Sequence, residues 1–177
     1  AFGGGTVHTE FEIMTGLSTI FFPRDTTVFQ RYLKNPLPSL GSILKKHDYR
    51  SLLIHPYHKW YYNRTEVYRK LGFDRFISLS SFEEKDDGYV SDKLVFNKIE
   101  KELEDGSNFI FAVTMQNHTP YTKSMCDDKL EYLGDFSTKG TRDHFNKYLN
   151  GLSETDKALR SLIDYLKTRE KETILLF

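Results

Sequence analysis

The sequence lacks several features that would assign it to an easily recognised class of protein. Only one of the 177 residues is cysteine, so no internal disulfide can form. No apolar run approaches the roughly 18–20 residues that a membrane-spanning helix needs. Lys and Arg number 25, as do Asp and Glu, so no excess charge favours nucleic acid or an anionic membrane as partner. The lone Cys126 lies in a polar stretch that we expect to be a loop, where a free thiol of no special role is the simplest interpretation.

The composition that remains is that of a globular domain rich in rings, with 15% aromatic and 28% charged residues. The length fits a single domain with a sizeable core. The chain opens at Ala1 without a basic leader and ends inside the apolar run at residues 174–177. We interpret it as a piece of a longer protein, whose localisation these ends do not reveal.

Strands and helices are predicted to alternate along the chain. Compact apolar runs predict strands at residues 51–54, 76–79, 109–113 and 173–177. Apolar spacing and capping residues predict helices near residues 9–17, 28–33, 40–44, 65–71, 92–105 and 141–168. This alternation is typical of an α/β fold with a largely parallel sheet flanked by helices. Ligands of such sheets gather beyond the carboxyl ends of strands, here at residues 55–64 and 114–121.

Three glycines at residues 3–5 lead directly into Thr6 and the predicted first helix. Glycine lets the backbone approach a ligand closely, and a helix start favours an anion. Thr6 would then hold its hydroxyl where a phosphate can sit. The alternative is that Thr6, or Thr9 with Glu12 three residues on, only caps the helix.

The first predicted strand end carries His55, and Arg64 follows nine residues later with Trp60, Tyr61 and Tyr62 between them. A guanidinium offers a planar fork of donors that matches a phosphate, and rings can stack on a glycerol or sugar. The alternative is a structural arginine that pairs with Glu66 or Asp74.

The strongest predicted strand is followed by the polar segment TMQNHTPY at residues 114–121, which contains His118. Polar residues at this position suit binding, although a lone histidine is more often a hydrogen-bonded surface residue. The remaining histidines lack the spacing of a His-Glu-x-x-His metal motif.

Taken together, four stretches resemble the extracellular catalytic domain of lipoteichoic acid synthases and related phosphoglycerol transferases, in the alkaline phosphatase/sulfatase superfamily. They are GTVHTEF with TGL (residues 5–11 and 15–17), HPYHKWYYNR (55–64), LGFD (71–74) and TMQNHTPY (114–121). Residues 1–177 would then be part of one sulfatase-like catalytic domain, incomplete at both ends.

The resemblance implies specific roles for site residues. Thr6 takes the place of the nucleophile and is itself a metal ligand. Arg64 and His118 fall on positions that bind the phosphoglycerol head group, and His55 lines the same pocket. Tyr62 stands where lipoteichoic acid synthases carry a tryptophan.

Tyr57 stands where those synthases carry an aspartate, so the exact substrate and acceptor are open. The resemblance implies a divalent cation, Mn²⁺ with Mg²⁺ or Zn²⁺ as alternatives. Its other ligands, an acidic residue before Thr6 and an Asp-His pair after the last strand, fall outside residues 1–177. We therefore expect this chain to lack the metal and to be inactive by itself.

The resemblance implies transfer of phosphoglycerol from a phosphatidylglycerol-type lipid to a hydroxyl of a glycolipid or polymer, by way of a covalent threonine intermediate. The protein would act on the outer side of a bacterial membrane, held there by segments outside residues 1–177, and would not bind nucleic acid. Alternatives are a phosphoethanolamine transferase, a phosphodiesterase or sulfatase, and a silent glycerophosphate-binding domain. The sequence after Cys126 lacks the Pro-x-Arg pattern of formylglycine sulfatases.

Overall fold

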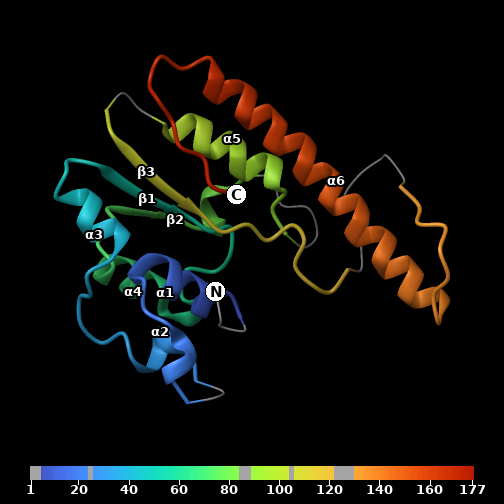
Figure 1. The fold of residues 1–177 in the computed structure, drawn as a ribbon, viewed down its shortest axis with the longest axis horizontal. Helices are drawn as coiled ribbons and strands as arrows, with labels where there is room; N and C mark the ends of the chain where they lie inside the picture. The colour runs from blue at the N-terminus through green and yellow to red at the C-terminus, as the bar shows by residue number, and fades with distance from the viewer. Residues whose placement is uncertain (1–4, 24–25, 84–88, 104–105, 122–129) are drawn as a thin grey trace. The chain divides into compact units, whose positions relative to one another are not determined.

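A computed structural model describes residues 5–23, 26–83, 89–103, 106–121 and 130–177. Its sheet has three parallel strands in the order β2-β1-β3, namely β1 (Arg50–Ile54), β2 (Arg75–Ile77) and β3 (Asn108–Ala112) (Figure 1). Leu53 of β1 lies opposite Phe76 on one side and Phe111 on the other. The predicted parallel α/β fold is therefore confirmed. The predicted loop around Cys126 lies outside the described residues.

The chain divides into two compact units, which are described separately. The first comprises residues 1–83 and 104–113 and the second residues 84–103 and 114–177. The first unit holds the sheet, four α-helices and three short 3-10 helices: α1 (Thr6–Thr15), α2 (Val28–Arg31), α3 (Leu40–Lys45), α4 (Arg64–Lys70), η1 (Thr19–Phe21), η2 (Tyr61–Asn63) and η3 (Leu79–Ser81). The second unit holds α5 (Asp92–Glu102) and α6 (Lys139–Lys167).

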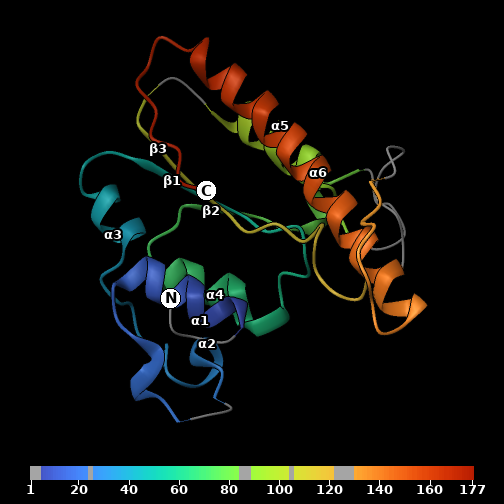
Figure 2. The same ribbon diagram turned by 45° about the vertical axis from the view of Figure 1, so that its right-hand side comes forward.

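The core of the first unit lies between one face of the sheet and the helices α1, α2 and α4. Figure 2 shows α1 and α4 on the same side of the sheet. Because side chains alternate along a strand, Leu53, Phe109 and Phe111 face this layer together. The buried residues of this core are Val7, Phe11, Met14, Val28, Phe29, Leu33, Leu53, Val67, Tyr68, Leu71 and Phe73.

The second unit is built on α5 packed along α6, as both views show (Figures 1 and 2). Val95 and Phe96 of α5 and Ala158 and Leu162 of α6 are buried. Helix α6 runs unbroken through Asn150 and Gly151. Within the described residues, no helix is both long and apolar enough to span a membrane.

Most predicted elements are confirmed, with ends shifted by one to three residues. Ser39 and Ser91 cap α3 and α5 as expected. The first helix begins at Thr6, and its cap is Gly5, so neither Thr6 nor Thr9 is the N-cap.

The strand predicted at residues 173–177 is wrong. These residues form no strand and are exposed, including Ile174 and Leu176 at 90% each. A strand needs hydrogen bonds to a neighbouring strand, which an apolar pattern by itself does not supply.

Gly72 provides a test of how α4 is joined to β2. Its φ is +83°, and a Cβ there would lie 2.7 Å from the Ser42 backbone. We expect Gly72→Ala to lower the free energy of unfolding by about 2–4 kcal/mol, from backbone strain and overlap together.

Gly16→Ala is the matched control, since its φ is +71° but no atom lies within 4 Å of the added carbon. It should lower stability by about 1–2 kcal/mol. Urea unfolding of both variants measures the difference, and equal losses would show that close packing on Ser42 does not matter.

Candidate active site

Thr6 lies at the exposed start of α1. It is the first helical residue, and Gly5 before it has φ 92°. The N–H groups of His8 and Thr9 bond back to the Gly5 carbonyl, whereas a helix leaves its earliest N–H groups without intrahelical partners. Those groups and the positive end of the helix dipole favour an anion beside the Thr6 hydroxyl.

One turn further along α1, Glu10 belongs to a buried ionic network. Its Oε1 accepts a hydrogen bond from Nη2 of Arg64 at 2.8 Å, and its Oε2 accepts one from the Tyr68 hydroxyl. The Nε of Arg64 donates to the Tyr68 hydroxyl at 3.1 Å. Glu10 and Arg64 are each 2% exposed. The network ties α1 to the first turn of α4.

The charges in this network stabilise one another. Burial by itself lowers the pKa of Arg64, but the Glu10 carboxylate and Tyr68 outweigh it and raise that pKa above its ordinary value. Burial, followed by the Glu10 charge, raises the pKa of Tyr68 well above its ordinary value. Tyr68 therefore stays protonated and acts as a donor to Glu10.

Arg64 keeps donors that this network does not use. Within the described part of the chain, its Nη1 has no hydrogen-bond partner. The guanidinium carbon lies 5.2 Å from the centre of the Tyr62 ring. The structural partners proposed from the sequence are wrong, because Glu66 pairs with Arg69 and Asp74 with Lys45.

The ion pair brings Arg64 to the helix that carries Thr6. Thr6 and Glu10 are four residues apart on α1, and such side chains lie on one face with Cβ atoms roughly 5–6 Å apart. Since Glu10 holds the guanidinium directly, the fold places a hydroxyl and a cationic fork on neighbouring turns of one helix face. A hydroxyl beside a cationic group is an arrangement that can serve phosphoryl transfer.

His55 lies at the end of β1, where its backbone N–H continues the ladder to Ile77. Its ring is 2% exposed, and Nδ1 lies 2.9 Å from the Val113 carbonyl. Because a carbonyl only accepts, Nδ1 carries a proton in this contact. The role of His55 as a pocket residue stays a prediction.

His118 belongs to the second unit and is exposed. Its Nδ1 lies 2.6 Å from the Thr119 carbonyl and 3.3 Å from the Tyr89 hydroxyl, and the Tyr89 ring meets its ring edge-on. Its contribution to head-group binding stays a prediction.

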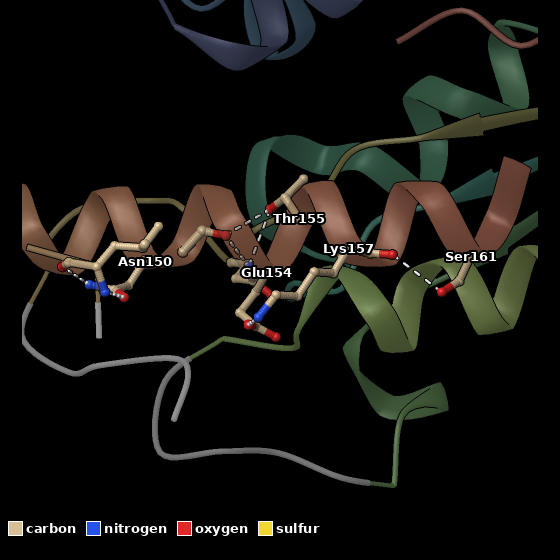
Figure 3. A network of polar contacts seen from close by, with 8 residues as sticks. Asn150, Glu154, Thr155, Lys157 and Ser161 are labelled. Carbon is tan, nitrogen blue, oxygen red and sulfur yellow. Dashed lines mark hydrogen bonds and ion pairs between the residues drawn. The ribbon is translucent and has the colours of Figure 1, made fainter. Parts of the chain in front are cut away.

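The segment that carries His118 is fixed by a buried polar network. Gln116 accepts from the Asp92 N–H at 2.8 Å and donates to the Gly151 carbonyl at 2.9 Å. Asn117 donates to Thr155, whose hydroxyl donates to Asp92 Oδ2 at 2.6 Å. Figure 3 shows Thr155 on α6 among its bonded partners, with Asn150 one and a half turns away.

Comparison with known proteins identifies the family of this chain. A sequence profile of the sulfatase family matches residues 1–177. The chain belongs to the sulfatase family. A putative cyclic beta-1,2-glucan modification protein of Rhizobium meliloti is 35% identical over 99% of this chain and 28% of its own length.

Two solved structures resemble this sulfatase-family chain. The phosphoglycerol transferase GacH of Streptococcus pyogenes, in complex with sn-glycerol-1-phosphate, is 26% identical with a TM-score of 0.75, over 97% of this chain and 47% of its own. The lipoteichoic acid synthase LtaP of Listeria monocytogenes is also 26% identical, with a TM-score of 0.73 over 91% and 40%. The resemblance to lipoteichoic acid synthases is thereby confirmed, and the chain spans less than half of each of these proteins.

A metal site is not formed by the residues that the structure describes. They contain no group of three or more His, Cys, Asp or Glu residues that could hold an ion. Glu10, the carboxylate one turn from Thr6, is already bonded to Arg64 and Tyr68. Thr6 by itself does not meet the ligand number that a divalent cation needs.

Sequence reasoning assigned no role to Glu10, Tyr68 or Asp92. For Glu10 a signal was present, because it falls at helical spacing among Val7, Phe11 and Met14, all of which are buried. A carboxylate inside an apolar stripe needs a buried partner. Asp92 had no comparable signal, since an acidic residue in a first helical turn is common on surfaces.

The buried pair predicts a large loss of stability on neutralising one partner. We expect Glu10→Gln to lower the free energy of unfolding by about 3–5 kcal/mol, because Arg64 is left as an unpaired buried charge. Urea unfolding at neutral pH measures the loss.

Glu66→Gln is the matched control on α4. Glu66 and Arg69 are also 2.8 Å apart, but their side chains are 48% and 69% exposed. This change should alter stability by no more than about 1 kcal/mol. Equal effects of the two substitutions would contradict a structural role for burial of the Glu10–Arg64 pair.

Asp92 predicts a distinct pH dependence. Burial raises the pKa of its carboxyl, against the opposing effect of the Thr155 and Thr114 hydroxyls, and Oδ1 has no partner of hydrogen-bonding geometry among the described residues. Above the ordinary carboxyl pKa of about 3.9 the folded state then binds more protons than the unfolded state, so this group makes stability fall as pH rises. Asp92→Asn should remove that fall, so the stability of the variant relative to the wild type should increase between pH 4 and 7.

Asp74→Asn is the control with the opposite sign. Burial would raise the pKa of Asp74, but Lys45 and Ser51 lower it. Asp74 therefore stabilises the fold above about pH 4 and loses this effect on acidification. Urea midpoints across pH 2–7 test both variants, and parallel curves for Asp92→Asn and wild type would contradict the role of Asp92.

Proposed function

We propose that this chain carries the nucleophile and phosphate-binding part of an enzyme that transfers phosphoglycerol from a phosphatidylglycerol-type lipid to a hydroxyl of a cell-envelope polymer. The observation that carries the proposal is the Glu10–Arg64 pair, which sets a guanidinium one helical turn from the exposed Thr6 hydroxyl. The 26% identity to a phosphoglycerol transferase bound to sn-glycerol-1-phosphate supports it.

In the proposed first step, the Thr6 oxygen attacks the phosphorus of the lipid head group. The Thr6–phosphorus bond forms, the bond to the diacylglycerol oxygen breaks, and the proton lost by Thr6 is balanced by the one that diacylglycerol gains. Nη1 of Arg64 and the first N–H groups of α1 donate to the phosphoryl oxygens, where negative charge grows. His55 and His118 are proposed to hold the glycerol and phosphate oxygens.

In the proposed second step, an acceptor hydroxyl attacks the glycerophosphoryl-threonine. The new phosphodiester forms, the bond to Thr6 breaks, and the acceptor proton returns the threonine hydroxyl. Water in place of the acceptor gives hydrolysis. Tyr62 is proposed to cover the site, because its ring lies over the guanidinium and shields it from solvent.

The resemblance implies a divalent cation, which would lower the pKa of the Thr6 hydroxyl and so make it a better nucleophile. We propose Mn²⁺, with Mg²⁺ or Zn²⁺ as alternatives. From the resemblance, we propose that the ligands other than Thr6 lie outside residues 1–177 and that this chain by itself is inactive.

The proposed acceptor is a glycolipid or glycan polymer on the outer side of a bacterial membrane. The relative from Rhizobium meliloti, a putative cyclic beta-1,2-glucan modification protein, supports a glycan acceptor. The lipoteichoic acid synthase of Listeria monocytogenes supports action in the cell envelope. Equal numbers of basic and acidic residues give no support for a nucleic-acid partner.

A second candidate is a catalytically silent domain that binds glycerophosphate. It is favoured by one observation, namely that the described residues hold no group of three metal-ligating side chains. The two candidates differ in whether Thr6 becomes covalently modified.

Thr6→Ala tests the nucleophile in the intact protein, including any chain beyond residues 1–177. We expect the variant to lose turnover of phosphatidylglycerol and the mass increase of a glycerophosphoryl group, because it removes the exposed hydroxyl at the start of α1. Thr9→Ala, a half-buried threonine on the same helix, should retain both. Turnover by Thr6→Ala at the wild-type rate would rule out Thr6 as the nucleophile.

The substrate is tested by offering the intact protein labelled phosphatidylglycerol, phosphatidylethanolamine and a sulfate ester, each with Mn²⁺, Mg²⁺, Zn²⁺ or none. Phosphatidylglycerol with metal should yield diacylglycerol and labelled Thr6. Preference for phosphatidylethanolamine or the sulfate ester would replace the proposed donor. Binding of glycerophosphate with no turnover under any condition would favour the silent domain.

A further inference from the structure

Four side chains between β1 and α4 form an aromatic cluster that is separate from the core. Tyr57, His58, Trp60 and Tyr61 contact one another in a closed cycle, with ring centres 5.1 Å apart for the first pair, 5.4 Å for His58–Trp60, 5.8 Å for Trp60–Tyr61 and 5.4 Å for Tyr61–Tyr57. None of the four belongs to the buried core of the first unit. Their packing therefore holds the rings in place without burying them.

Trp60 is the most exposed member of the aromatic cluster. It is 68% exposed, although a ring of this size gains stability when water is excluded from it. The His58 ring stacks on it at an interplanar angle of 21°. One indole face is thus supported from behind, and the exposure leaves the opposite face as a flat, pre-positioned surface.

The aromatic cluster is continuous with the phosphate-binding arginine. The Tyr61 ring centre lies 4.3 Å from that of Tyr62, and Tyr62 lies against the Arg64 guanidinium at 5.2 Å. Tyr62 and Asn63 each have a φ of 55°, a backbone conformation that residues other than glycine rarely adopt. This local turn directs the chain from the exposed rings to the buried arginine within four residues.

We propose that the aromatic cluster is the acceptor subsite, and that Trp60 stacks on a pyranose ring of a neutral glycan. The proposal rests on the proposed function and adds to it the chemistry of the second substrate. The C–H groups on one side of a pyranose are apolar and weakly positive, which suits the negative face of an indole. Tyrosine hydroxyls and histidine nitrogens at the edges of the cluster match the sugar hydroxyls.

A glycan suits this surface better than a membrane does. Surface helices that bind membranes combine a long apolar face with many basic residues, whereas the cluster sits on a turn with the single cation Lys59. Three of its four ring contacts are edge-to-face and the fourth is stacked, so the rings are held in place and Trp60 presents one flat face instead of a protruding apolar wedge. The reaction also needs a hydroxyl delivered toward Arg64, which a sugar stacked on Trp60 can provide.

Trp60 is the only tryptophan of the chain, so its fluorescence reports directly on this surface. We expect neutral oligosaccharides of glucose, galactose or rhamnose, four to six units long, to shift or quench the emission in a saturable way without metal or lipid. Phosphatidylcholine and phosphatidylglycerol vesicles should leave the emission unchanged. No response to any of the three sugars, or a response to vesicles alone, would overturn the proposal.

Calorimetric titration of Trp60→Ala with the responding sugar should show affinity at least tenfold weaker. Phe21→Ala is the matched control, because Phe21 is 87% exposed in the same unit but lies outside the aromatic cluster, and it should bind as the wild type does. Both variants should keep the wild-type urea midpoint. Equal sugar affinity of Trp60→Ala and wild type would also overturn the proposal.

The intact protein separates this subsite from the proposed chemistry. Trp60→Ala should raise KM for the glycan acceptor at least tenfold, whereas Phe21→Ala should leave this KM unchanged. Thr6→Ala should abolish both transfer to the glycan and hydrolysis of phosphatidylglycerol, and should keep sugar binding. Sugar binding without any lipid turnover would refute the proposed transferase activity but support the sugar subsite. Lipid turnover without sugar binding would support the transferase activity but refute the subsite.

Discussion

The buried pair of Glu10 and Arg64 is the interaction on which the arrangement of the first unit depends. It joins two helices from positions 54 residues apart, and each partner would be strongly unfavourable inside the protein without the other. Tyr68 satisfies the second carboxylate oxygen and is held protonated by burial. Because the pair is so costly to break, the geometry between the start of α1 and the start of α4 is fixed.

That constraint fixes which charged group lies near the exposed start of α1. A hydroxyl at a helix start is common and usually without function, but here the same helix anchors a guanidinium one turn away. The remaining donors of Arg64, the face of Tyr62 and the aromatic cluster then form a continuous series from a guanidinium to an exposed indole. A buried ion pair thus supports the two ends of this series, to which we have assigned the phosphate and the sugar of the proposed substrates.

The second unit shows a different way of fixing a segment that follows a strand. Residues 114–121 are not held by apolar packing alone, since Gln116 and Thr155 both bond to the buried Asp92 and Asn117 donates to Thr155. The bonds in this network are directional, so they fix the conformation of the segment that carries His118. The raised pKa of Asp92 is the electrostatic consequence of burying a carboxylate that has no cationic partner among the residues the structure describes.

The sequence was enough to predict the parallel α/β fold, six helical segments and three strands, because apolar periodicity and capping residues act locally. The motifs around Thr6, Arg64 and His118 were enough to identify the family. The run at residues 173–177 reads as a strand in the same way, yet it forms none, because strand formation depends on a hydrogen-bonding neighbour that no local pattern specifies.

Only the tertiary structure decided which partner Arg64 takes. Glu66 and Asp74 were nearer in the sequence, but α1 delivers Glu10 to the guanidinium from 54 residues away. The tertiary structure also decided the partner of Asp92, which accepts a hydrogen bond from Thr155, 63 residues away. It likewise decided that Trp60 is exposed while its ring stacks on His58. Composition and spacing determine which segments form and which family they belong to, whereas the pairing of buried charges depends on how helices pack, and packing is a property of the whole unit.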